Sequence, residues 1–284
     1  MIITTTVQEM QSVIQQAKVR GQSIGFTPTM GALHEGHLSL VLRMKEECDL
    51  SICSIFVNPT QFNQTADLDS YPRTVKADTD LLREVGCDVV FVPSVAEMYP
   101  HGSDYELDVN LDGLDTRMEG AHRPGHFAGV VQVVHRLIEI TSCDRIYMGQ
   151  KDFQQFTIIR QMLRDLKLTT RLVVCDIVRG EDGLALSSRN RRLLPEHRRD
   201  ANVIHRVLSL AKEWIQDRDV KHIEETALSY LSIPGFRPEY FDLINGHNLL
   251  SITSKDDAEL IVACTAVWAG DVRLIDNMVL KGTL

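Results

Sequence analysis

The stretch that decides the fold is T-P-T-M-G-A-L-H-E-G-H, at residues 27–37. Residues 23–26, just before it, form a short apolar run typical of a buried strand. The apolar residues of 38–42, just after it, recur at helical spacing. The stretch is therefore predicted to be a strand-to-helix turn, in which Gly31 and Gly36 allow a tight backbone path and close approach.

Two histidines, His34 and His37, lie three residues apart where the helix is expected to begin, so both can face the same way. A helix start presents unpaired N–H groups and the positive end of the dipole, which favour phosphate. The dipole contributes only about 0.3–1 kcal/mol at exposed sites, so the imidazoles must supply more. Half of a zinc site is the alternative, but the spacing is not H-E-x-x-H. We interpret the turn as a nucleotide site.

The composition sets the class of protein. Of the 284 residues, 44% are hydrophobic and 24% are charged, which is usual for a globular protein long enough for two domains. No apolar run approaches the roughly 20 residues of a membrane span, and the first residues lack a signal-peptide pattern, so a cytoplasmic protein is expected. The net charge of −9 argues against nonspecific nucleic-acid or membrane binding. Six scattered cysteines indicate reduced core residues.

Strand-like and helix-like patterns alternate through the first part of the chain. Strands are predicted near residues 50–57, 88–93, 145–148 and 171–175, and helices near 74–85, 130–140 and 153–166. This alternation predicts an α/β fold, a Rossmann-like parallel sheet with helices on both faces. Ligands in such sheets bind at the carboxyl ends of the strands.

The pattern changes after about residue 178. Two helices, near 195–216 and 220–231, are followed by closely spaced strands near 240–244, 260–267 and 273–275. Strands without crossover helices pair antiparallel, so a smaller C-terminal α+β domain is predicted. The expected domains are residues 1–177 and 178–284.

Three polar segments are candidates for the site, and neither G-x-G-x-x-G nor G-x-x-x-x-G-K-[ST] occurs. The first segment contains Asn58 and Gln61, whose amides can read hydroxyls and carboxylates, although an Asn-Pro turn is the simpler explanation. In the second, Lys151 suits a phosphate and Asp152 a ribose hydroxyl or a metal ion, while Gln155 lies one turn further on. An ordinary polar helix face is the alternative.

The third segment is Leu186-Ser187-Ser188-Arg189. Two hydroxyls and a guanidinium can clamp a triphosphate, each charge-assisted hydrogen bond contributing about 1.5–3 kcal/mol. The alternative is a solvated basic face formed with four further arginines, Arg191, Arg192, Arg198 and Arg199.

Taken together, these motifs resemble the pantothenate synthetase (pantoate–β-alanine ligase) family, of the HxGH-type nucleotidyltransferase superfamily. The similarity includes N-P-x-Q-F at 58–62, R-P-G-H-F at 123–127, G-x-K-D-x-x-Q at 149–155 and W-A-G-D-V-R-L-I-D-N at 268–277, and runs nearly end to end. It implies ATP-dependent joining of pantoate to β-alanine through a pantoyl-adenylate, with release of pyrophosphate and AMP. It also implies Mg²⁺ and a homodimer.

The resemblance also implies roles for individual residues. His37, His34, Lys151 and Arg189 are the expected catalytic residues. Gln61, Gln155 and Asn58 are expected to bind pantoate, and Asp78 is a candidate ligand of Mg²⁺. The expected ATP contacts are Met30, Gly31, His34, His37, Gly149, Gln150, Lys151, Asp152, Val178, Leu186, Ser187, Ser188 and Arg189. The chain departs from the family at Gln150, where Glu is usual, and a segment at 67–74 is expected to close over the site.

Two other functions stay open at this point. One is another HxGH-type nucleotidyltransferase acting on a different small acid or a phosphorylated alcohol. Such an enzyme would need cationic groups where Gln61 and Gln155 stand. The other is a catalytically silent nucleotide-sensing module, which has little use for two amides beside a complete phosphate clamp.

Overall fold

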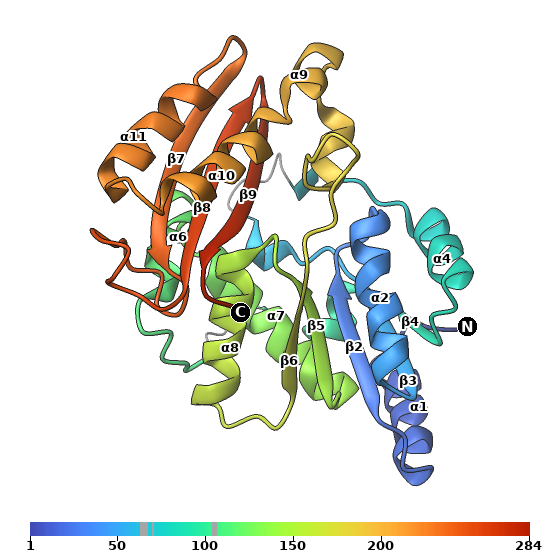
Figure 1. Ribbon diagram of the computed structural model, residues 1–284. Helices are drawn as coiled ribbons and strands as arrows, with labels where there is room; N and C mark the ends of the chain where they lie inside the picture. The colour runs from blue at the N-terminus through green and yellow to red at the C-terminus, as the bar shows by residue number, and fades with distance from the viewer. Residues whose placement is uncertain (63–67, 70, 104–106) are drawn as a thin grey trace. The chain divides into compact units, whose positions relative to one another are not determined.

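The computed structural model describes residues 1–62, 68–69, 71–103 and 107–284. The chain divides into two compact units (Figure 1). The large unit comprises Met1–Gly149 and Gln154–Cys175, and the small unit comprises Gln150–Phe153 and Asp176–Leu284. The segment 67–74, expected to close over the site, includes residues 67 and 70, which lie outside the described residues.

A six-stranded sheet forms the centre of the large unit. Its strands are β1 (Ile2–Thr4), β2 (Ile24–Thr29), β3 (Leu50–Ile55), β4 (Val89–Phe91), β5 (Arg145–Gly149) and β6 (Arg171–Cys175). The order is β1-β4-β3-β2-β5-β6 and every pairing is parallel, which confirms the predicted parallel sheet. The edge strand β1 was not predicted, because a run of three residues carries too little pattern.

Helices cover both faces of this sheet, as predicted. The α-helices are α1 (Val7–Val19), α2 (Glu35–Glu47), α4 (Val75–Glu84), α5 (Val95–Met98), α6 (Glu119–His122), α7 (His126–Thr141) and α8 (Phe153–Asp165), and the 3₁₀ turns are η1 (Pro59–Gln61) and η2 (Leu114–Thr116). Right-handed crossovers place α2 and α4 on one face and α1, α7 and α8 on the other. Accordingly, α2 packs on β2, β3, β5 and α4, whereas α7 packs on β2 and α1.

The position of α2 follows from close packing on β2. The buried face of α2 includes Val41 and Met44, which join a core cluster with Cys53 and Tyr147 of the sheet. A Cβ at Gly25 of β2 would lie 2.4 Å from Met44 Cγ, so only glycine lets the helix approach this closely. The start of α2 is thereby fixed at the carboxyl edge of the sheet.

The strand order also places the topological switch point. From β2 the chain crosses towards β3 and β4, whereas from β5 it crosses the other way to β6, and β2 and β5 are neighbours. The carboxyl ends of β2 and β5 therefore mark the point of the sheet at which parallel α/β proteins bind ligands.

The small unit has the predicted α+β character. It contains η3 (Ser188–Arg192), α9 (Pro195–Asp200), α10 (Val203–Trp214), α11 (Val220–Leu231) and the antiparallel strands β7 (Phe236–Asn245), β8 (Ile261–Ala269) and β9 (Val272–Lys281). Helices α10 and α11 pack on this sheet around one apolar cluster. The single helix predicted at 195–216 is wrong. The Ile204 N–H bonds to the Ala201 carbonyl, three residues back, and this tighter turn separates α9 from α10.

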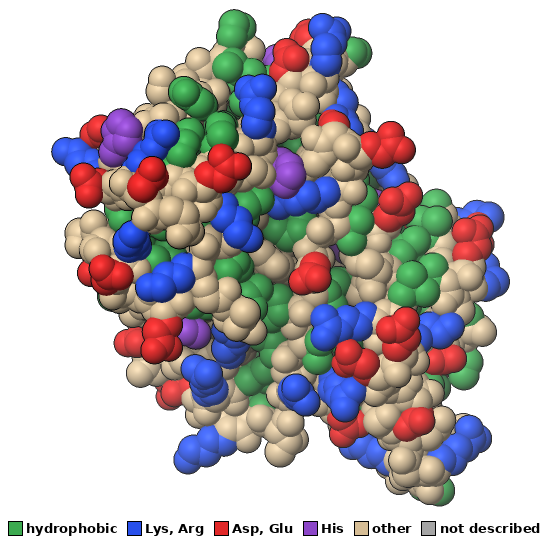
Figure 2. All heavy atoms as spheres, viewed as in Figure 1, with side chains coloured by type: hydrophobic (Ala, Val, Ile, Leu, Met, Phe, Trp, Pro, Cys, Tyr) green, Lys and Arg blue, Asp and Glu red, His purple; other side chains and the backbone are tan. Residues whose placement is uncertain are grey.

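The surface and the cysteines agree with the composition. Acidic and basic side chains are interspersed on the face drawn in Figure 2. No helix in the described part of the chain is long and apolar enough to cross a membrane. All six cysteines are free thiols, and burial raises the pKa of Cys87 and of Cys143 to about 11, which keeps both as inert core residues.

Burial raises the pKa of the Glu224 carboxyl on α11, which accepts the Leu243 N–H at 2.8 Å. A raised folded-state pKa means that stability is fully present below the ordinary Glu pKa and falls as pH rises through the folded value. Glu224→Gln should therefore raise the melting temperature at about pH 7, with the gain shrinking towards about pH 4.

Glu225→Gln, at a position whose side chain is 65% exposed, is the matched control and should show no such pH dependence. A gain in melting temperature for Glu224→Gln that grew towards acid pH would contradict a raised Glu224 pKa in the folded protein.

Candidate active site

A buried carboxylate shapes the turn after β2. Asp78 of α4 is 2% exposed, and it accepts the N–H groups of Ala32 at 3.0 Å and Leu33 at 2.8 Å and the Thr74 hydroxyl at 3.1 Å. Gly31 and Ala32 have φ of +79° and +51°. A Cβ at Gly31 would lie 2.9 Å from Asp78 Oδ2, so this position requires glycine both for its conformation and for space.

The turn ends in a capping box made by the two histidines. His34 is the N-cap of α2, and its Nδ1 accepts the Gly36 N–H at 3.1 Å. In return, His37 Nδ1 accepts the His34 N–H at 3.4 Å. Ser, Thr or Asp usually fills the N-cap, with Glu at the third helical position. The two imidazoles make the same capping hydrogen bonds, and each ring has a second nitrogen, Nε2, that is able to donate.

The capping box also fixes the tautomers of both rings. A backbone N–H can only donate, so each Nδ1 presents its lone pair and each neutral ring carries its proton on Nε2. The ring centroids lie 4.1 Å apart with the planes at 41°. His34 and His37 are therefore paired neutral N–H donors at the positive end of α2, an arrangement suited to phosphate oxygens.

Buried amides lie on the other side of this turn. Asn58, which is 1% exposed, accepts the Tyr99 hydroxyl at 2.9 Å and donates to the Gly129 carbonyl at 3.1 Å and to Gln61 Oε1 at 3.5 Å. The Gln61 amide nitrogen lies 2.8 Å from Met30 Sδ. The structure thus brings Asn58, Gln61 and Met30 together with the histidine turn, and the Asn58 amide is engaged in holding Gln61.

His126, for which no role was predicted, holds the backbone of Gln61. Its Nδ1 lies 2.7 Å from the Gln61 carbonyl, and its Nε2 lies 3.1 Å from Arg123 Nη1. The carbonyl can only accept and the guanidinium can only donate, so His126 is neutral with its proton on Nδ1. The R-P-G-H-F motif was a visible signal, but the partner 65 residues away was not.

Two adjacent glutamines on α8 differ in their surroundings. Gln154 is 3% exposed, accepts the Glu119 N–H at 2.9 Å and donates to the carbonyls of Leu114 and Arg117, both at 2.7 Å. Gln155 is half-buried, and within the described part of the chain no residue hydrogen-bonds its side chain. A half-buried amide of this kind is suited to a ligand.

Apart from the turn after β2 and Gly149, the expected ATP contacts belong to the small unit. Lys151 has an 18% exposed side chain, with Nζ 3.7 Å from Asp152 Oδ1. The Gln150 side chain donates to Asn277 Oδ1 at 3.1 Å. At Gly149, the last residue of β5, an added Cβ would meet no described protein atom within 4 Å, so protein packing does not require glycine there and a ligand has room to approach.

The expected clamp, residues 186–189, follows a short hairpin formed by residues 178–186. The Leu186 N–H bonds to the Val178 carbonyl at 3.0 Å. Ser187 caps η3 by accepting the Arg189 N–H at 3.3 Å, which leaves its hydroxyl proton to donate. Of the arginines interpreted as a solvated face, Arg198 instead pairs with Asp182 of the hairpin and lowers the pKa of that carboxyl.

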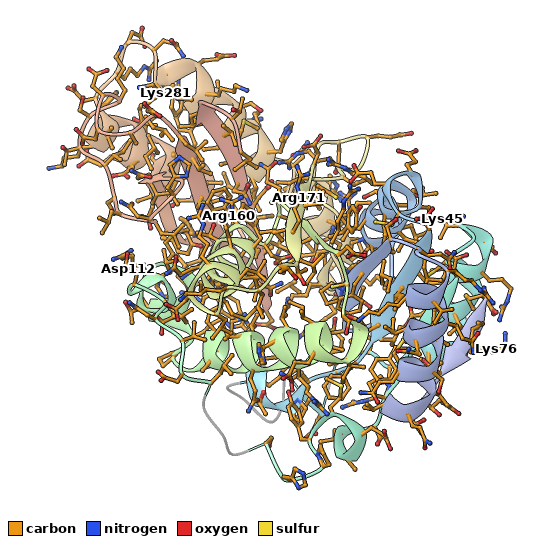
Figure 3. All side chains as sticks on the ribbon, turned by 90° about the horizontal axis from the view of Figure 1, so that it is seen from below. Lys45, Lys76, Asp112, Arg160, Arg171 and Lys281 are labelled. Carbon is orange, nitrogen blue, oxygen red and sulfur yellow. The ribbon has the colours of Figure 1, made fainter. Side chains whose placement is uncertain are left out.

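Two surface lysines of the large unit have other partners. Lys45 of α2 and Lys76 of α4 lie at the edge of this unit in Figure 3. Lys45 donates to the Val85 carbonyl at 3.0 Å, and Lys76 pairs with Asp80 at 2.8 Å. Neither lysine is a candidate for the phosphates.

The described residues contain no cluster of three or more His, Cys, Asp or Glu side chains that could hold a metal ion. Asp78 accepts three hydrogen bonds within the fold, which accounts for its charge without a metal. Mg²⁺ that enters with a nucleotide is held largely by phosphates and water, with only one or two carboxylates. Among the described residues, the donor set around Asp78 is therefore not that of a resident metal site.

Asp78→Asn should destabilise the protein by about 1–3 kcal/mol, because an amide nitrogen cannot accept the N–H that one carboxylate oxygen accepts. The measurement is urea unfolding. Asp80→Asn on the same helix is the control, since its exposed side chain pairs with surface Lys76 and Arg83, and little change is expected. Equal unfolding free energies for wild type and Asp78→Asn would show that Asp78 does not hold the turn.

Comparisons with known proteins identify the family of the chain. The pantoate-beta-alanine ligase family matches residues 2–279. The pantothenate synthetase of Bacteroides thetaiotaomicron is 43% identical over 282 residues, 99% of each chain. The crystal structure of pantothenate synthetase from Thermus thermophilus has a TM-score of 0.92 and 38% identity, and covers 99% of this chain and 100% of that one.

The pantoate-beta-alanine ligase of Francisella tularensis, complexed with beta-gamma ATP and beta-alanine, has a TM-score of 0.80 and 35% identity, covering 99% of this chain and 98% of that one. The resemblance read from the motifs is thereby confirmed. The chain belongs to the pantoate–β-alanine ligase family.

Proposed function

We propose that this protein joins pantoate to β-alanine with consumption of ATP, through a pantoyl-adenylate. The observation that carries the proposal is the capping box of His34 and His37, which presents two neutral N–H donors at the start of α2. The same turn contacts Gln61, an uncharged group suited to a hydroxy acid. The complex of the Francisella tularensis relative with beta-gamma ATP and beta-alanine supports the choice of substrates.

In the first step, a carboxylate oxygen of pantoate attacks the α-phosphate of ATP. A bond forms between this oxygen and phosphorus, the bond to the bridging oxygen breaks, and pyrophosphate leaves with the electron pair. Negative charge moves towards the leaving group, where N–H donors and cations stabilise it most. We assign His37 and His34 to the phosphate at the start of α2, and Lys151, Ser187, Ser188 and Arg189 to the remaining charge.

The remaining expected ATP contacts are part of the same proposal. Met30 and Gly31 belong to the turn, and Gly149, Gln150 and Asp152 to the segment after β5. Val178 and Leu186 are paired across the base of the hairpin. In this scheme residues 1–177 bind nucleotide and pantoate, while residues 178–284 carry the clamp.

Gln61 and Gln155 are assigned to pantoate. Both are amides of the large unit, and neither brings a positive charge, so they select an acid that offers hydroxyl groups over a phosphorylated alcohol. Asn58 acts mainly through Gln61, since its own amide bonds to Tyr99 and Gly129.

In the second step, the amine of β-alanine attacks the acyl carbon of the adenylate. The carbon–nitrogen bond forms, AMP leaves with the former carboxylate oxygen, and the nitrogen loses a proton. A mixed anhydride is already activated, so this step needs little beyond positioning and exclusion of water. No protein nucleophile is required.

Three further expectations belong to the proposal. Mg²⁺ accompanies ATP and is bound chiefly by its phosphates, the protein is a homodimer, and it works in the cytoplasm. Each has its own measurement, respectively the dependence of activity on Mg²⁺, the mass in solution and the location in the cell.

The order of steps is tested by label exchange. Because activation precedes amide formation, labelled pyrophosphate should enter ATP when pantoate is present and β-alanine is absent. AMP should accumulate only after the amine is added. Exchange that requires β-alanine would contradict this order of steps, and exchange without pantoate would overturn the proposed ligase function. A phosphorylated alcohol in place of pantoate tests for a different nucleotidyltransferase.

The two glutamines of α8 provide a matched pair of variants. Gln155→Leu should raise the pantoate KM about tenfold or more with little change in the ATP KM, since a substrate hydrogen bond is lost. Gln154→Leu should instead lower the melting temperature, because it leaves the Glu119 N–H and two carbonyls without their partner. Equal weakening of both substrates by Gln155→Leu would show that its amide does not face pantoate.

A further inference from the structure

Strand β9 carries an asparagine whose amide nitrogen and oxygen are both hydrogen-bonded within the small unit. Asn277 is 2% exposed. Its Nδ2 donates to the carbonyls of Gln150 at 3.0 Å and Lys151 at 2.9 Å, and its Oδ1 accepts from the Gln150 side chain at 3.1 Å. Both amide protons and the oxygen are therefore committed to one short segment, 127 residues earlier in the chain.

This contact restricts the path of the segment that carries Lys151. The carbonyls of successive residues point in opposite directions in an extended chain. Here two successive carbonyls turn towards one amide group, which fixes the dihedral angles between them and hence the direction in which the Lys151 side chain leaves the backbone. Residues 150–153 belong to the small unit together with Asn277.

The preceding residue of β9 holds the other candidate phosphate segment. Asp276 is 4% exposed and pairs with Arg179 through two hydrogen bonds of 2.6 and 3.0 Å. Arg179 also donates to the Gly183 carbonyl at 3.1 Å, inside the hairpin that leads to Ser187. Asp276 Oδ1 accepts the Asn277 N–H at 2.8 Å, so the two contacts are linked directly.

We propose that Asn277 is a positioning residue for adenylate formation, which acts by holding the backbone of Gln150 and Lys151. With Asp276 and Arg179 it joins the Lys151 segment and the Ser187–Arg189 segment into one preformed array within the small unit. This gives the W-A-G-D-V-R-L-I-D-N motif a function that its sequence did not suggest. The inference rests on the proposed function, in which Lys151 acts on the phosphates.

The test is a double-mutant cycle, read by pantoate-dependent exchange of pyrophosphate with ATP. Asn277→Leu has similar volume but no donors, and displacement of a catalytic group by about 1 Å can cost 10²-fold. We therefore expect a loss of kcat of about 10²-fold with the pantoate KM nearly unchanged. In a Lys151→Ala background the same substitution should cost little more, since residues that act through one another are not additive.

Hydrogen exchange without substrates gives a second readout. Asn277→Leu should speed amide exchange in residues 149–153. Asp257→Ala in the small unit is the control, because the hydrogen bonds that it removes, from the Thr253 and Ser254 N–H groups, lie within residues 253–257. It should lower the melting temperature and leave kcat and the exchange at 149–153 unchanged. If Asn277→Leu does not fold, Asn277→Ser, which keeps one donor, should show an intermediate loss.

The outcomes separate this inference from the proposed function. Equal losses from Asn277→Leu with and without Lys151 would overturn the positioning role, as would unchanged protection of 149–153. Full activity of Lys151→Ala would instead remove Lys151 from the proposed chemistry, while the hydrogen-exchange result would still decide whether Asn277 holds the segment.

Discussion

The site of the large unit depends on one buried carboxylate. Asp78 accepts the N–H groups of Ala32 and Leu33 and thereby holds a turn with two successive residues of positive φ. Without a buried acceptor, two amides in the interior would remain unpaired, at a cost of about 1–3 kcal/mol each. The turn in its observed form delivers His34 to the N-cap of α2. Asp78 thus acts on the position of the histidines through the backbone of Ala32 and Leu33.

The hydrogen bonds that cap α2 also determine which ring nitrogen of each histidine is able to donate. A Ser or Asp at the N-cap would satisfy the same backbone amide, but it would present no further N–H donor. Imidazole accepts through Nδ1 and donates through Nε2 at once, so capping fixes the tautomer that a phosphate needs. The dipole of α2 then adds to these N–H donors.

Much of the fold followed from local pattern, and most of the site's support did not. The apolar runs at β3, β5 and β6 predicted a parallel sheet because strands buried on both faces are apolar throughout. The short edge strand β1 and the break between α9 and α10 after Asp200 have no comparable apolar pattern, so neither was predicted. The motifs named the residues expected at the ligand. The capping box of the histidines is local, but other contacts that hold these residues join positions 45 to 127 apart, as for Asp78 and Leu33 or Asn277 and Gln150, and no local spacing reports such pairs.

The same principle organises both units. Residues assigned to a substrate are held by buried polar groups whose own hydrogen bonds are made within the fold, as His126 holds Gln61 and Asn277 holds Lys151. Such groups are costly to bury unless every donor and acceptor is paired, and once paired they admit few alternative arrangements. Apolar packing alone would stabilise the units but leave these backbones free to shift. Chemistry that depends on positioning and charge needs groups fixed before the substrate arrives, so the buried polar contacts that hold these backbones matter for the proposed reaction.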